Sequence, residues 1–191
     1  MDDDNQNSTE QRHVELVPYN PDWSRLADQE AKRILEDLSF PVIGIYHMGS
    51  TSVPGIKAKP ILDFVLEVEN LEDVIENVEV FNNLGYTSKG EFGILGRQFF
   101  TRDTDGERTH HLHVFQQGHP DIERHLVFRD YLRANPDAAR EYESLKEELA
   151  QRFPKASGSY TEAKSEFILS MDEVARYWVE HRGLNKGSED Q

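Results

Sequence analysis

The chain has 191 residues, with 36 acidic against 21 basic side chains, a formal net charge of -15 and no cysteine. This length suits one well-buried domain, and no break in composition suggests a second. The acidic balance disfavours duplex nucleic acid and anionic membranes as partners, and the missing cysteines exclude disulfides, thiolate zinc sites and cysteine nucleophiles.

The two ends of the chain are polar and differ from the rest. Residues 1–12 form an acidic segment and residues 183–191 a second polar one, so we expect disordered tails around a single domain of residues 13–182. The N-terminus has no apolar signal core, and no stretch approaches the ~20 apolar residues that a membrane span needs. A cytoplasmic location is therefore expected.

The first half of the domain is predicted to alternate helices and strands. Asn20-Pro21 supplies an N-cap with proline in the first turn, and Asn70 caps a second helix that Gly85 ends. Two apolar strands enclose a Gly- and Pro-containing loop over residues 49–60. The predicted elements are a helix over residues 21–38, strands over 42–46 and 61–68, and a helix over 70–84.

The second half is predicted to contain a β-hairpin followed by helices. Asp105-Gly106 is a strong hairpin-turn signal between two alternating segments. This element order is typical of an α+β domain with a C-terminal helical layer. The predicted elements are strands over residues 98–102 and 109–115, and helices over 121–133, 136–153 and 162–182.

The first candidate motif is the segment from His47 to Gly55, which contains Gly49, Ser50 and Thr51. Glycine lets the backbone approach a ligand closely, and Ser and Thr hydroxyls with successive N–H groups can cradle phosphate oxygens. Lys57 and Lys59 add positive charge nearby. The segment is no Walker loop, because no Gly-Lys-Ser/Thr occurs in it. The alternative is a surface loop whose small residues merely turn the chain.

The second candidate is Asp63, which lies in an apolar predicted strand. Alternation places Asp63, Val65 and Glu67 on one face and the intervening residues on the other. An ionised aspartate in such a strand is costly unless it is paired or bound to a metal. A structural salt bridge to Arg or Lys is the alternative to a functional role.

The third candidate is the histidine segment over residues 109–115. In a strand, His111 and His113 lie on one face, where paired imidazoles could bind a metal or phosphate or take part in acid–base chemistry. Exposed, solvated histidines are the alternative, and His110 is expected to be a bystander near the turn. Of the basic residues in this acidic chain, Arg97 and Lys164 are predicted to contact a ligand.

With these motifs in place, the sequence resembles the GrpB family, a set of small proteins with a nucleotidyltransferase-like fold. The resemblance covers about residues 13–178 and consists of several joined motifs in one order. They are the segments 47–51, 53–55, 59–63, 85–86, 90–93, 96–97 with Phe100, 111–114, 125–126, 128–133 and 142–149, and Tyr160 with Lys164.

This resemblance implies a mixed sheet, with a Gly-Ser loop beside carboxylates that bind a metal and activate a hydroxyl to attack a nucleotide phosphate. The superfamily pattern continues with Asp-x-Asp on a strand and a third carboxylate on a neighbouring strand. Here Asp63 matches, whereas the second position is Val65. Two Mg²⁺ ions need several such ligands, and the candidates to substitute are Glu67, Glu91, His111 and His113.

Three functions compete on this evidence. The first is a nucleotidyltransferase-like enzyme that uses Mg²⁺ or another divalent metal and acts on a nucleotide or small phosphorylated substrate, with Asp63, Glu67 and His113 in catalysis. The second is a non-catalytic nucleotide- or phosphometabolite-binding module, which Val65 favours. The third is a hydrolase whose metal ligands are Asp63, His111 and His113. The predicted phosphate contacts are Gly49, Ser50, Thr51, Lys59, Arg97, Arg129 and Lys164.

Overall fold

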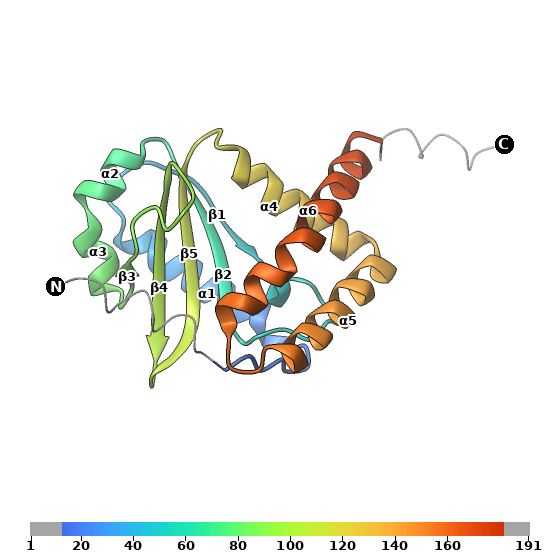
Figure 1. Ribbon diagram of the computed structural model, residues 1–191. Coiled ribbons are helices and arrows are strands. Elements are labelled where there is room, and N and C mark those ends of the chain that lie inside the picture. The colour runs from blue at the N-terminus through green and yellow to red at the C-terminus, as the bar shows by residue number, and fades with distance from the viewer. Residues whose placement is uncertain (1–12, 182–191) are drawn as a thin grey trace.

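A mixed five-stranded sheet organises the chain, in the order β1-β2-β5-β4-β3. Strands β2 and β5 are parallel and every other neighbouring pair is antiparallel. The computed structural model describes residues 13–181, so both predicted tails lie outside the described residues (Figure 1). The strands are β1 (Val42–Met48), β2 (Leu62–Val68), β3 (Thr87–Ser88), β4 (Arg97–Thr104) and β5 (Glu107–Gln116).

Helices cover both faces of this sheet. Helices α1, α2 and α3 pack on one face, named the α1 face, and α4 packs on the other, named the α4 face. Helices α5 and α6 form a further layer against α4, as the orange end of the ribbon in Figure 1 shows. The helices are α1 (Asp22–Asp37), α2 (Leu71–Glu76), α3 (Val78–Asn83), α4 (Pro120–Ala134), α5 (Pro136–Arg152) and α6 (Ser157–His181).

The predicted α+β class and its C-terminal helical layer are therefore confirmed, as is the mixed sheet that the family resemblance implied. Among residues 13–181, no helix has both the length and the apolar character to lie across a bilayer. The single-domain boundaries and the cytoplasmic compartment stay predictions.

The alternation of β2 decides what each face of the sheet receives. Phe64 and Leu66 are fully buried among the α1, α2 and α3 side chains, whereas Asp63, Val65 and Glu67 lie on the α4 face. A strand turns successive side chains to opposite sides, so a single polar–apolar pattern predicts both environments. The face assignment made from the sequence is confirmed.

Two turn predictions had different outcomes. The Asp105-Gly106 hairpin is confirmed, and both residues have positive φ, 53° and 84°, as a tight two-residue turn requires. The single helix predicted over residues 70–84 is wrong, because it breaks into α2 and α3 at Asn77. The side chain of Asn77 donates to the carbonyl of Asp73 at 2.7 Å, so it competes locally with continued helix formation.

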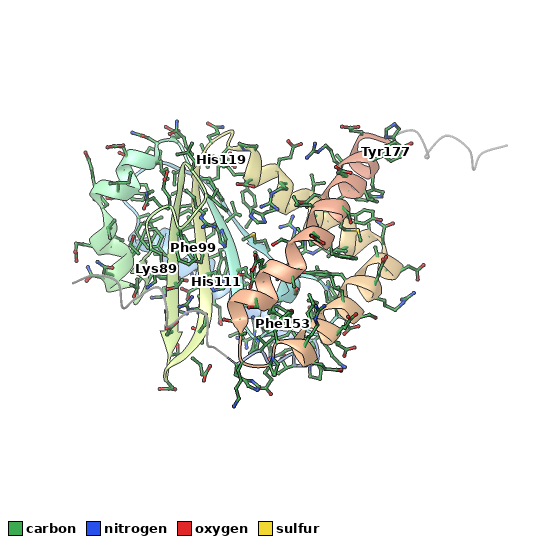
Figure 2. The ribbon with its side chains drawn as sticks, viewed as in Figure 1. Lys89, Phe99, His111, His119, Phe153 and Tyr177 are labelled. Carbon is green, nitrogen blue, oxygen red and sulfur yellow. The ribbon has the colours of Figure 1, made fainter. Side chains whose placement is uncertain are left out.

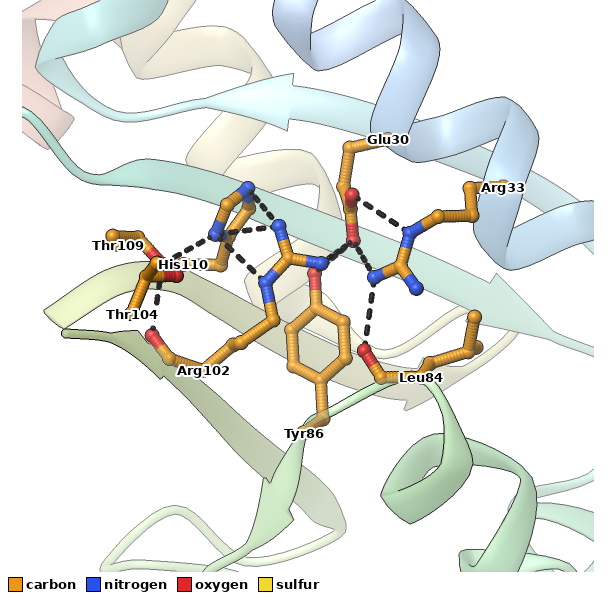
Figure 3. A network of polar contacts seen from close by, with 8 residues as sticks. All are labelled: Glu30, Arg33, Leu84, Tyr86, Arg102, Thr104, Thr109 and His110. Atoms are coloured by element: carbon orange, nitrogen blue, oxygen red, sulfur yellow. Dashed lines mark hydrogen bonds and ion pairs between the residues drawn. The ribbon is translucent and has the colours of Figure 1, made fainter.

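A buried polar network ties α1 to the sheet on the α1 face (Figure 3). One carboxylate oxygen of Glu30, a residue that is 7% exposed, accepts from Arg33 at 2.7 Å and from Tyr86 and Arg102 at 2.8 Å. The Nε of Arg102 donates to His110 at 3.2 Å. The expectation that His110 is a bystander near the turn is wrong. Its place in β5 turns the ring into the α1 face, where burial and then Arg102 lower its pKa to about 4.

Candidate functional site

The turn at Gly49 faces the carboxylate of Asp63. Strand β1 ends at Met48, which pairs with Asp63 in the sheet, and the chain then turns at Gly49 with φ 71°. A Cβ atom placed on Gly49 would lie 2.4 Å from the Oδ2 atom of Asp63. Only glycine allows this close approach, because it carries no Cβ and adopts positive φ freely. The carboxylate therefore lies against the backbone of the Gly-Ser turn.

The hydroxyl groups of this turn have different roles. Ser52 Oγ donates to the carbonyl of Gly49 at 2.6 Å. The Thr51 hydroxyl donates to the main-chain carbonyl just before β2 at 3.1 Å and lies 2.9 Å from His47 Nε2. Thr51 is 2% exposed, so it shapes the turn from inside. Within residues 13–181, the Ser50 side chain has no hydrogen-bond partner, so its hydroxyl is available to a ligand.

Two arginines of α4 hold the turn from the helical side. Arg129 donates to the carbonyl of His47 at 3.0 Å and to Asp130 at 2.7 Å. Arg133 donates to the carbonyl of Ser52 at 2.8 Å. The predicted phosphate contact Arg129 is thus placed as a clamp on backbone carbonyls. Arg133 performs the same task and was not singled out from the sequence.

Asp63 and His111 form a hydrogen-bonded pair on the α4 face. They are direct partners in the β2–β5 register, and His111 Nδ1 lies 2.8 Å from Asp63 Oδ1. Both side chains are 25% exposed. Burial raises the pKa of Asp63, but the hydrogen bond and charge of His111, together with the charge of Lys164, outweigh it and hold that pKa below its usual value. Asp63 is therefore an ionised, partly accessible carboxylate at neutral pH.

His113 lies one step along β5, beside Val65 rather than beside a carboxylate. Its Nδ1 lies 3.2 Å from Arg97 Nη1, and its ring centroid is 5.6 Å from that of His125 on α4. Loss of hydration, followed by His125 and Arg97, lowers the pKa of His113 well below the usual value. The neutral imidazole of His113 accepts a hydrogen bond from Arg97.

Arg97 organises the loop that leads into β4. Its Nε donates to the carbonyl of Glu91 at 3.1 Å and its Nη2 to the carbonyl of Phe92 at 2.7 Å. The residue is 5% exposed, and burial lowers its pKa to about 10. Arg97 was predicted to contact a ligand. In the structure its buried guanidinium instead forms hydrogen bonds with the carbonyls of Glu91 and Phe92 and with His113.

Phe99 on β4 lies beside both site histidines. Its ring centroid is 5.4 Å from that of His111 and 4.8 Å from that of His113. Figure 2 shows Phe99 and His111 next to each other on the two neighbouring strands. Aromatic residues were noted in this part of the sequence, but Phe99 was not singled out. Its contact with both histidines follows from the β4–β5 register.

Glu67, predicted to act with Asp63, lies at the other end of β2. Four residues of extended strand separate the two by about 13 Å. Glu67 lines a cavity of about 450 Å³ together with Glu123 and Asp130. Val65 lies between the two acids and is fully buried. Within the part of the chain that the structure describes, no three His, Asp or Glu side chains are grouped so that they could hold a metal ion.

Three lysines from separate elements lie near one another, and two of them, Lys59 and Lys164, are close enough to Asp63 to interact with its charge. Lys59 precedes β2, Lys146 comes from α5 and Lys164 from α6, and we call them the lysine cluster. The Nζ atoms of Lys59 and Lys164 lie 4.2 Å and 5.3 Å from the ring centroid of Tyr160. Lys146 is 1% exposed and donates to the carbonyl of Lys57. Among residues 13–181, no carboxylate forms an ion pair with any of the three.

The electrostatics of the lysine cluster follow from burial and like charge. Burial and then the charge of Lys164 lower the pKa of Lys59 to about 8 and that of Lys146 to about 7. Sequence reasoning selected Lys59 and Lys164 but missed Lys146. A signal was present, because Lys146 belongs to the buried stripe of α5 that also contains Ala139, Tyr142 and Leu149.

Known proteins with similar sequences and structures support this assignment of fold. The model of the family described as GrpB protein matches residues 13–173. The UPF0157 protein YqkA of Bacillus subtilis is 44% identical over 177 residues, which are 93% of this chain and 51% of that protein, so the chain spans about half of its length. The crystal structure of GrpB from Enterococcus faecalis has 38% identity and a TM-score of 0.80, over 86% of this chain and 99% of that one.

The chain also has a more distant structural match. The Cid1 poly(U) polymerase, in a crystal structure bound to MgATP, is 13% identical with a TM-score of 0.48, over 68% of this chain and 42% of its own. At this level of similarity the match carries no argument about activity, and the functional case rests on the residues of the site.

Proposed function

The chain belongs to the GrpB family, and on this premise we propose that it binds a nucleotide or another small phosphorylated molecule between the Gly49 turn and the lysine cluster. The observation that carries the proposal is the lysine cluster, none of whose members forms an ion pair with a carboxylate among residues 13–181, in a chain of net charge -15. Two of its members, Lys59 and Lys164, interact with the Asp63 carboxylate, which the backbone of the Gly49 turn closely approaches.

The lysine cluster brings like charges together in a partly buried site. Burying several ammonium groups together is unfavourable, and the lowered pKa values of Lys59 and Lys146 express that cost. A bound phosphate group supplies the missing negative charge and accepts hydrogen bonds from the lysine Nζ atoms. The Ser50 hydroxyl offers a further donor at the turn.

The proximity of Asp63 to this anion site gives a reason for a divalent cation. The charge of Lys164 lowers the pKa of Asp63, and the charge of Asp63 raises the pKa of Lys59. A phosphate bound to these lysines would therefore lie close enough to be repelled by the Asp63 carboxylate. Two anions at close range repel unless a cation lies between them. Mg²⁺ often binds through one or two carboxylates, substrate phosphates and several waters, and Asp63 is suited to be that carboxylate.

We propose a single divalent ion held by Asp63 and the ligand phosphate, and not a pair of ions. Val65 occupies the position of a second carboxylate and is buried against α4, while Glu67 lies about 13 Å along the strand from Asp63. When bound, a single ion would act as a Lewis acid on a phosphoryl oxygen. His111 holds the Asp63 carboxylate in one orientation and helps to keep it ionised.

Calorimetric titration with ATP and with inorganic tripolyphosphate, each in the presence of MgCl₂, tests the binding proposal. We expect Lys59→Ala and Lys164→Ala each to weaken both ligands by about tenfold, the loss typical of one charged hydrogen bond. Lys57→Ala is the matched control. It removes the same charge from the same loop, but its ammonium pairs with Glu147 on α5. Equal losses in all three variants, or none in the first two, contradict the proposal.

A phosphoryl or nucleotidyl transfer reaction is a second candidate, and the ionised, partly exposed Asp63 favours it. Wild-type protein should then turn over a nucleoside triphosphate with a hydroxyl acceptor in the presence of Mg²⁺ or Mn²⁺. Asp63→Asn should abolish that turnover while the protein stays folded. Binding without turnover across a panel of nucleotides and acceptors would leave the non-catalytic module as the function.

A further inference from the structure

The loop between β3 and β4 holds an aromatic ring at the edge of the α4 face. Phe92 is 52% exposed, and its ring stacks on Phe99 with the centroids 5.4 Å apart and the planes 27° apart. Phe99 itself is 7% exposed. One face of the Phe92 ring is therefore backed by the protein, and the ring keeps a large exposed area. An exposed aromatic ring in a fixed place is a feature of binding sites.

The position of Phe92 is held by specific hydrogen bonds. Its carbonyl accepts from the buried guanidinium of Arg97 at 2.7 Å, and the carboxylate of Glu91 accepts from the Gly96 N–H at 2.7 Å. Phe92 also has a φ of 43°, a left-handed conformation that bulky side chains rarely adopt. Such strain persists only where the surroundings impose it, and it concentrates at binding and catalytic sites.

A line of contacting rings joins Phe92 to Asp63. Phe92 contacts Phe99, Phe99 contacts His111, and His111 bonds Asp63. Strand β4 is separated from β2 by β5 alone, so Phe99 and Asp63 lie on strands about 10 Å apart. Along the strand direction, Phe99 is level with Val65, two residues beyond Asp63, whereas Lys59 of the lysine cluster comes before the start of β2. The site therefore has an aromatic end and a cationic end, with the carboxylate between them.

We propose that Phe92 stacks on the nucleobase of a nucleotide whose phosphates bind the lysine cluster. This inference rests on the proposed phosphate-binding function and narrows the ligand to phosphates with a planar aromatic ring, in place of ringless molecules such as sugar phosphates or polyphosphate. Stacking on an aromatic side chain tolerates any base, because every base has a π face. Phe92 therefore sets the ligand class without choosing among the bases.

The test compares a ligand with a base and a ligand without one. Phe92→Gly removes the ring and adopts positive φ without strain, so the variant is expected to stay folded, which thermal unfolding checks. We expect its affinity for ATP to fall about tenfold while its affinity for tripolyphosphate is unchanged. Phe92→Tyr keeps the ring and should bind ATP within twofold of the wild type.

Leu95→Ala is the matched control in the same loop, because Leu95 is 84% exposed. It should leave both affinities unchanged. If Phe92→Gly binds ATP as tightly as the wild type does, the inference is wrong. It is also wrong if the variant loses the same factor in affinity for ATP and for tripolyphosphate. If the wild-type protein binds neither ligand, the proposed function itself fails, an outcome distinct from the loss of base stacking alone.

Discussion

The polar network of the α1 face and the lysine cluster on the other side of the sheet differ in their partners. On the α1 face, the arginines of the Glu30 network meet a carboxylate, and the network is complete within the chain (Figure 3). On the α4 face and beside it, Arg97 and Lys146 donate to backbone carbonyls, while Lys59 and Lys164 lie over an aromatic ring. A completed network stabilises the fold, whereas Lys59 and Lys164, which form no ion pair among residues 13–181, are the basis of the proposed anionic ligand.

Neighbouring histidines of β5 illustrate the difference. His110 points into the α1 face and serves the network, while His111 points to the α4 face and binds Asp63. The two residues are adjacent in sequence and of one type, yet the pleat of the strand separates their roles. If the comparison is correct, substitutions on the α1 face should cost stability, and those on the α4 face should cost binding.

The largest expected effect is that of Glu30→Ala. The substitution leaves the buried Tyr86 hydroxyl, the partly buried Arg102 and the more exposed Arg33 without their common acceptor, so the free energy of unfolding should fall by about 3–5 kcal/mol. Urea denaturation measures this. Glu36→Ala on the same helix is the control, because Glu36 forms an exposed pair with Lys32 and its loss should cost less than about 1 kcal/mol. Equal costs in the two variants would remove the distinction between the faces.

Gly49→Ala should have the next largest effect. The new Cβ meets the Asp63 carboxylate, and the φ of 71° is unfavourable for alanine, so we expect a loss of about 2–4 kcal/mol. Gly55→Ala isolates the backbone part of the cost, because Gly55 has φ 86° and open space around its Cα. Combining Gly49→Ala with Asp63→Ala should recover part of the loss, as a double-mutant cycle measures. Strict additivity would show that the turn and the carboxylate do not touch.

The smallest effect concerns the pH dependence of stability in Lys146→Met. Burial and then Lys164 lower the folded-state pKa of Lys146 to about 7, below the unfolded-state value. The unfolded chain thus binds more protons above pH 7, and the wild type gains stability as pH rises through that window. The variant lacks this gain, so the free energy of unfolding of the wild type, relative to that of the variant, should rise by about 2–3 kcal/mol between pH 6 and pH 9.

Lys57→Met is the control for that measurement, because Lys57 pairs with Glu147 and its pKa is raised. It should leave the slope between pH 6 and pH 9 unchanged. If the difference in the free energy of unfolding between the wild type and Lys146→Met does not change with pH, burial does not lower the pKa of Lys146. The lysine cluster would then lose one of its three members.

Much of the fold could be predicted from local patterns. The Asp105-Gly106 turn, the faces of β2 and β5, and the helices of the second half follow from periodicity and turn chemistry, which depend on residues near one another in sequence. The site was predicted less completely. Arg97 and Arg129 were expected to contact a ligand. Arg97 instead donates to two backbone carbonyls, and Arg129 to one carbonyl and to Asp130, because a guanidinium satisfies whatever acceptors surround it after folding.

The sequence by itself determined the α+β order, the family, and the presence of a lone aspartate on one face of an apolar strand. The tertiary structure decided that Gly49 touches Asp63, that Lys146 joins Lys59 and Lys164, and that Phe92 lies on a ring beside His111. The physical reason is the distance along the sequence over which each kind of interaction acts. Alternation and capping act over a few residues, whereas the convergence of charges depends on how α5 and α6 pack, which no local pattern encodes.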